Sequence, residues 1–176
     1  MGLNTIFFTS LVLLLVIERL LELRAAKRNL KRLLADGGRE FGAGHYPVIV
    51  AMHVAFFASL IIEFYLWDSP LARFWEIPFG IFILAQGLRL WARRAMGDRW
   101  TTRVIVIPGE RLIASGPFRF VRHPIYVAVV LELFSLPLIF RLYVTCVVFT
   151  ILNACLLRFV RIPAEERALA WSQDIV

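Results

Sequence analysis

Two short charged motifs contain the side chains best suited to chemistry. Residues 122–126 read RHPIY, and residues 161–169 read RIPAEERAL. An arginine binds a carboxylate and adjacent glutamates bind an ammonium, so the two motifs together are suited to holding the zwitterionic group of an amino acid. Pro124 favours the first turn of a helix, which places His123 at the start of that helix. The alternative for the first motif alone is a basic membrane anchor.

A charge inside an apolar segment is a second candidate for function. Glu132 lies in segment 125–140, about 12 Å from its start at about 1.5 Å per helical residue. A charged side chain in a bilayer costs roughly 3 kcal/mol, so Glu132 is a candidate catalytic base. The alternative is an interhelical hydrogen bond, for example with Asn153 of the next apolar segment. The same two interpretations apply to Glu18 and Glu22, which share a helix face, and to His53 and Glu63.

These side chains have to be positioned by helices in a membrane. Of the 176 residues, 60% are hydrophobic and 19% are charged, which is more apolar surface than one water-soluble core can bury. The sequence therefore predicts a single all-α integral membrane domain over residues 1–176. Its five expected transmembrane helices are residues 5–23, 46–67, 74–92, 125–140 and 142–157.

The basic residues predict the orientation of these helices. Sixteen Lys and Arg residues follow the first, third and fifth spans, whereas the alternate loops hold only Arg73 and Arg141. This excess predicts an outside N-terminus and a cytoplasmic C-terminus. Arg19 and Arg89 lie inside spans near their cytoplasmic ends, where we expect them to snorkel to the surface. Because topology accounts for the net charge of +7, no nucleic acid partner is expected.

The last two spans are short, and the segments beside them are long. Residues 125–157 reach about 50 Å as a helix, less than the roughly 60 Å that two crossings need. We therefore expect a tight hairpin with Arg141 at its tip, with incomplete crossing as the alternative. Residues 93–124 and the C-terminal tail are expected to form a cytoplasmic cap. The histidines, at positions 45, 53 and 123, do not cluster with each other or with cysteines, so no metal site is expected.

The sequence GPFRFVRHPIY at residues 116–126, followed by RIPAEERAL, resembles the isoprenylcysteine carboxyl methyltransferase family, which carries RHP-x-Y and R-x-x-x-E-E-x-L at these relative places. The resemblance covers roughly residues 95–170. It implies a multi-span enzyme that takes a methyl group from S-adenosylmethionine, releases S-adenosylhomocysteine and binds this cofactor under a cytoplasmic cap. It also implies a lipophilic acceptor that enters from the membrane lipids and, by similarity to bacterial members, a location in the bacterial inner membrane.

The resemblance also implies roles for individual residues. The expected cofactor-binding residues are Leu112, Ile113, His123, Pro124, Tyr126, Glu165 and Glu166. Arg161 is expected to anchor the cofactor or face the acceptor. Together with Glu132, Arg161 and Glu166 are the expected catalytic residues. Ala128 stands where the family often has glycine, and this departure weakens the prediction of a prenylated-peptide substrate.

Two classes of methyl acceptor stay open. A carboxylate, as in prenylcysteine, needs no base, whereas a phenol or enol benefits from one such as Glu132 or Glu18. The GHYP sequence at residues 44–47, with Glu132 and Asn153, is similar to bacterial members that O-methylate alkylpyrones or alkylresorcinols, so we favour a hydroxyl acceptor. The sequence is also compatible with a phospholipid N-methyltransferase, a lipid-phase NADPH-dependent reductase or a non-catalytic membrane protein.

Overall fold

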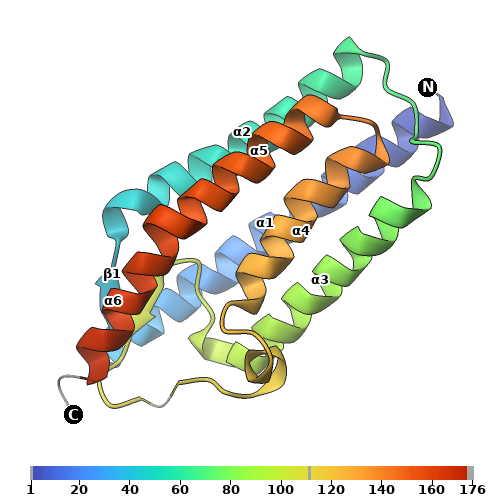
Figure 1. The fold of residues 1–176 in the computed structure, drawn as a ribbon. Helices are drawn as coiled ribbons and strands as arrows, with labels where there is room; N and C mark the ends of the chain where they lie inside the picture. The colour runs from blue at the N-terminus through green and yellow to red at the C-terminus, as the bar shows by residue number, and fades with distance from the viewer. Residues whose placement is uncertain (1, 111, 174–176) are drawn as a thin grey trace.

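The computed structural model describes residues 2–110 and 112–173, which form a helical bundle with a small sheet at one end (Figure 1). The α-helices of these residues are α1 (Leu3–Ala35), α2 (Tyr46–Leu66), α3 (Glu76–Met96), α4 (Pro124–Ile139), α5 (Tyr143–Leu156) and α6 (Ile162–Gln173). Short helical turns are η1 (Ala43–His45), η2 (Gly97–Arg99), η3 (Gly116–Arg119) and η4 (Leu157–Arg161). Helix α4 packs against both α3 and α5, and α5 also packs against α2.

Helix α1 is longer than the predicted span 5–23. Residues 24–35 continue the helix because they are rich in Ala, Leu, Lys and Arg and contain neither Gly nor Pro. The helix ends before Gly37, whose φ of 86° is the left-handed conformation that glycine adopts without strain. The basic residues from Arg24 to Arg32 therefore lie on a helical extension of the first span, whereas Arg39 lies beyond the end of the helix.

Two short strands are the exception to the all-α prediction. Strands β1 (Arg39–Phe41) and β2 (Val104–Val106) pair in antiparallel fashion, with Arg39 opposite Val106. They join the segment between α1 and α2 to the segment between α3 and α4. Contacts between α6 and both strands place the C-terminal helix beside this sheet.

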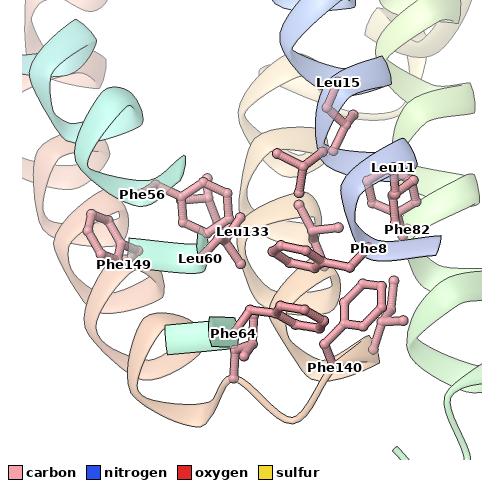
Figure 2. Packing of buried hydrophobic residues seen from close by; sticks show 14 of the residues in the cluster. Phe8, Leu11, Leu15, Phe56, Leu60, Phe64, Phe82, Leu133, Phe140 and Phe149 are labelled. Carbon is pink, nitrogen blue, oxygen red and sulfur yellow. The ribbon is translucent and has the colours of Figure 1, made fainter. Parts of the chain in front are cut away.

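The hydrophobic core runs along the interior of the bundle and is rich in aromatic rings (Figure 2). Phe8 of α1 stacks on Phe64 of α2, with ring centroids 3.8 Å apart. Phe140, which follows α4, meets Phe8 edge-on at 5.1 Å. Leu60 and Leu133 fill the space beside these rings and are 0% and 2% exposed. The core therefore joins α1, α2 and α4, so that the helix that carries the first motif is firmly held.

Many large apolar side chains face outward instead. They include Leu13, Leu14, Ile83, Leu84, Val147 and Ile151. Two helical stretches of the described residues, Ala43–Leu66 and Tyr143–Ser172, are long and apolar enough to cross a membrane, and α4 is a shorter apolar helix. An outer surface of this kind suits an integral membrane protein, because lipid covers it. The count of five spans stays a prediction.

Helices α4 and α5 form the expected hairpin, with Arg141 between them at a φ of 59°. The helix of the fifth span, however, does not end near residue 157. It continues through η4, a π-helical turn, into α6. The sequence placed the end of the span there because Arg158 and Arg161 interrupt the apolar run. Charged residues end a membrane span, but they do not end a helix.

Candidate functional site

Four side chains from the two charged motifs meet where α4 begins and α6 begins. The Tyr126 hydroxyl donates a short hydrogen bond to Glu165 Oε2, and Arg161 Nε donates to the Tyr126 hydroxyl at 3.0 Å. His123 Nδ1 lies 3.6 Å from Glu165 Oε1, and the His123 ring stacks on the Tyr126 ring with centroids 5.2 Å apart. We call His123, Tyr126, Arg161 and Glu165 the motif cluster. The structure thus joins two motifs that are far apart in the sequence.

Local sequence explains why these side chains converge. Pro124 is the first residue of α4, and His123 precedes it as the N-cap residue. The wide π-helical turn η4 shifts the phase of the helix and leaves Arg161 buried, with 8% of its surface exposed. Ala164 and Ala168, which are 2% and 0% exposed, are small enough to let α6 pack closely against the sheet. Each motif therefore presents its polar groups toward the other.

Arg161 also binds a third segment of the chain. Its Nη2 donates to the backbone carbonyl of Thr102 at 2.9 Å. Thr102 lies just before β2, and Tyr126 lies in α4. The guanidinium group of Arg161, in the turn before α6, therefore connects that turn to both α4 and the segment that leads into β2. A guanidinium held at two of its nitrogens has a fixed plane, which is a requirement for directional binding of a carboxylate.

His123 is the titratable group of the motif cluster that lies outside the helices. The Glu165 carboxylate beside its ring raises the pKa of His123 above its usual value, and Glu166 adds to this effect. Burial acts in the opposite direction and is outweighed. His123 therefore carries more positive charge near neutral pH than a histidine in water.

An open groove lies beside the motif cluster. Its volume is about 370 Å³. His123 and Tyr126 form part of its wall, and most of the remaining wall is aliphatic. The lining residues are Val121, Arg122, His123, Tyr126, Val127, Val130, Leu131, Leu157 and Ile162. The wall of the groove is therefore mostly apolar and suited to a hydrocarbon chain, with Arg122, His123 and Tyr126 as its polar lining residues.

The other residues expected at the cofactor site do not bond to the motif cluster. Pro124 is buried at the start of α4, whereas Glu166 is exposed on α6. Leu112 and Ile113 lie in the segment before η3, and Leu112 is 58% exposed. Within the described residues, no hydrogen bond or ion pair connects these side chains to the motif cluster.

Glu132 lies in a separate group of charges inside the bundle. It accepts hydrogen bonds from Arg19 at 2.9 and 2.7 Å and from Arg89 at 3.5 Å. Glu22 accepts hydrogen bonds from Arg19, Arg89 and Arg93. We call Arg19, Glu22, Arg89, Arg93 and Glu132 the ion network. It links α1, α3 and α4, and Glu132 is not part of the groove wall.

The ion network corrects two expectations. The suggested bond between Glu132 and Asn153 does not form, and Asn153 Nδ2 is a buried atom without a hydrogen-bond partner among the described residues. A carboxylate binds a guanidinium more strongly than a neutral amide, and arginines of α1 and α3 lie within reach. Arg19 and Arg89 therefore point into the bundle to neutralise carboxylates instead of snorkelling to its surface.

Thr102 and Tyr46 are site residues that sequence reasoning missed. Thr102 contributes a backbone carbonyl, which every residue type has, so its role leaves no sequence signal. The Tyr46 hydroxyl lies 3.1 Å from Thr102 Oγ1. Tyr46 was visible only as part of the GHYP turn, and nothing in that turn indicates contact with a segment near residue 102.

Comparison with known proteins identifies the family of the chain. The sequence pattern of the isoprenylcysteine carboxyl methyltransferase family matches residues 78–171, which include the whole motif cluster. The chain is also similar to uncharacterized protein YpbQ of Bacillus subtilis, with 38% identity over 92% of this chain and 96% of that protein. An uncharacterized protein of Haemophilus influenzae is 28% identical over 86% of this chain and 88% of its own length. No solved structure matches the chain. The chain belongs to the isoprenylcysteine carboxyl methyltransferase family.

Proposed function

We propose that this protein is an integral membrane methyltransferase that transfers a methyl group from S-adenosylmethionine to a lipophilic acceptor. Family membership supports the reaction class. The observation that carries the proposal is the meeting of the two motifs in one hydrogen-bonded cluster beside an apolar groove. A polar site for the cofactor and an apolar site for the acceptor then lie next to each other.

The donor set of the motif cluster fits this cofactor. Arg161 is a buried cation that suits the carboxylate of the methionine part, and Glu165 suits its ammonium group. His45 Nε2 is a buried atom without a hydrogen-bond partner among the described residues, and Arg161 lies within electrostatic range of this ring. A polar group of a ligand would give that nitrogen a partner. When bound, the cofactor supplies an electrophilic methyl group on a sulfonium.

The residues of the chain then have to bind the cofactor and the acceptor, orient them relative to each other and exclude water. Methyl transfer is an in-line displacement, so alignment of donor and acceptor supplies much of the rate enhancement. Arg161 and Glu165 would hold the amino acid end of the cofactor, while His123 and Tyr126, which belong to the motif cluster, also line the groove. We further propose that Leu112, Ile113 and Glu166 approach the bound cofactor from the segments around the motif cluster.

The groove supports a lipophilic acceptor that enters from the side. Its aliphatic wall suits an alkyl or prenyl chain, and a carboxylate or hydroxyl next to the lining residues His123 and Tyr126 would lie beside the rest of the motif cluster. Between these acceptors we favour the hydroxyl. We assign no proton transfer to Glu132, because Arg19 and Arg89 already bind its oxygens and it lies outside the groove wall. The site is proposed to face the cytoplasm, as the sorting of basic residues predicts.

The cofactor part of the proposal is tested by calorimetry on the detergent-purified full chain with S-adenosylhomocysteine. The unaltered protein should bind it, and Arg161→Ala should weaken binding at least tenfold because a charge-assisted contact is lost. Arg158→Ala is the matched control, since Arg158 is exposed in the same helical turn. Absence of binding by the unaltered protein would contradict the proposed function. Equal binding by Arg161→Ala would contradict the site.

The acceptor needs a separate measurement. Lipid extracts from cells with and without the gene should differ by mass in a lipophilic species that carries one additional methyl group. A methyl ether on a phenol or enol supports the hydroxyl acceptor, and a methyl ester supports the carboxylate. A methylated amine headgroup would contradict both and indicate a phospholipid N-methyltransferase.

A further inference from the structure

Two successive contacts connect Arg161 to Tyr46, a residue outside the part of the chain matched to the family. Its Nη2 binds the Thr102 carbonyl at 2.9 Å. The side chain of the same threonine lies 3.1 Å from the hydroxyl of Tyr46, the first residue of α2. Tyr46 therefore contacts the residue that fixes one end of the Arg161 guanidinium. The family match begins only at residue 78.

The aromatic ring of Tyr46 is held by a separate contact. The guanidinium of Arg103 lies over the Tyr46 ring at 4.5 Å from its centroid. Arg103 Nη1 donates to Glu40 Oε1 at 2.6 Å, and Glu40 lies in β1. Pairing of β1 with β2 holds Glu40 and Arg103 together. The segment between α1 and α2 thus supports the Tyr46 ring, whose hydroxyl points to Thr102.

We propose that Tyr46 is a positioning residue of the cofactor site. Its hydrogen bond to Thr102 Oγ1 holds the Thr102 carbonyl where Arg161 Nη2 binds it, and so sets the plane of the guanidinium. This inference rests on the proposed function, because it assigns Arg161 to cofactor binding. By this inference, a residue of the N-terminal part of the chain helps to form a site whose two motifs both lie in the C-terminal half.

The first test compares dissociation constants for S-adenosylhomocysteine by calorimetry on the full chain. Tyr46→Phe removes only the hydroxyl and keeps the ring under Arg103. We expect it to weaken binding about three- to tenfold, the effect of one hydrogen bond. Tyr65→Phe is the matched control, since Tyr65 is 57% exposed near the other end of α2, and it should bind as the unaltered protein does.

A double-mutant cycle separates positioning from general support of the fold. Arg161→Lys keeps the charge but cannot make the two-point contact with Tyr126 and the Thr102 carbonyl. In that background, Tyr46→Phe should change binding by less than about twofold, because the guanidinium through which it acts is gone. Additive effects would show that Tyr46 does not act through Arg161, and would overturn the inference.

If Arg161→Lys binds S-adenosylhomocysteine too weakly to measure, a second double-mutant cycle tests whether Tyr46 acts through Thr102. Thr102→Val removes Oγ1 but keeps the carbonyl and the branched shape. Thr102→Val, Tyr46→Phe and the double variant should all show the same loss, with melting temperatures close to that of the unaltered protein. Unchanged affinity in Tyr46→Phe, while the unaltered protein binds S-adenosylhomocysteine, overturns this inference alone. Absence of binding by the unaltered protein removes the proposed function and this inference with it.

Discussion

The ion network and the motif cluster are both built from arginine and glutamate, yet they differ in the burial of their carboxylates and in the partners of these carboxylates. In the ion network, the carboxylates of Glu22 and Glu132 are 4% and 8% exposed and are surrounded by guanidinium groups. In the motif cluster, the side chains of His123 and Glu165 are 23% and 30% exposed and lie near an open groove. Buried charges that satisfy one another hold helices together, whereas charges beside a groove can still bind a ligand.

The largest effect on stability is expected in the ion network. Glu132→Ala leaves Arg19 and Arg89 without one of their carboxylates, and breaking a buried pair in this way typically destabilises by roughly 3 to 5 kcal/mol. We therefore expect a large fall in melting temperature and in the yield of folded protein in detergent. Arg19→Met combined with Glu132→Leu should recover part of the loss, since both members of the pair are then removed. A melting temperature equal to that of the unaltered protein in Glu132→Ala would contradict this role.

A smaller effect is expected at Gly116, which begins the turn before the motif cluster. Its φ is 60°, and a Cβ there would lie 2.8 Å from the Cβ of Ala95 in α3. Gly116→Ala should destabilise by roughly 1 to 3 kcal/mol through strain and close contact. It should also weaken binding of S-adenosylhomocysteine, because this turn leads into the segment that carries His123. Gly80→Ala is the control, since a Cβ on that helical glycine meets nothing within 4 Å and alanine favours a helix.

The smallest effect is the pH dependence of stability that His123 contributes. Because Glu165 raises the pKa of His123 in the folded protein, the protonated ring stabilises the fold. This contribution is fully present below the unfolded pKa of about 6.5 and is lost as the pH rises through the higher folded pKa. The difference in melting temperature between the unaltered protein and His123→Gln should therefore be larger at acidic than at alkaline pH. A difference that grows as the pH rises would contradict the sign.

The sequence predicted the position of the helices better than their rotation. The second span, 46–67, nearly coincides with α2, and the meeting of the two motifs follows from a hairpin whose open ends carry them. The partners of Glu132 could not be predicted in the same way. Which neighbour a helix face meets depends on how the whole bundle packs, and a single sequence does not contain that information. The bond between Arg161 and the Thr102 carbonyl could not be predicted either, because every residue has a backbone carbonyl and the sequence does not indicate which one is used.

The most direct test of the difference between the two groups is to make the same substitution in each and to measure two quantities. Glu165→Gln and Glu132→Gln both remove one charge and keep the shape of the side chain. We predict that Glu165→Gln weakens binding of S-adenosylhomocysteine at least tenfold and lowers the melting temperature less than Glu132→Gln does. Glu132→Gln should lower the melting temperature while the folded protein binds S-adenosylhomocysteine within about twofold of the unaltered protein. The reverse pattern, or equal loss of both properties in the two variants, would contradict the assignment of ligand binding to the motif cluster and of stability to the ion network.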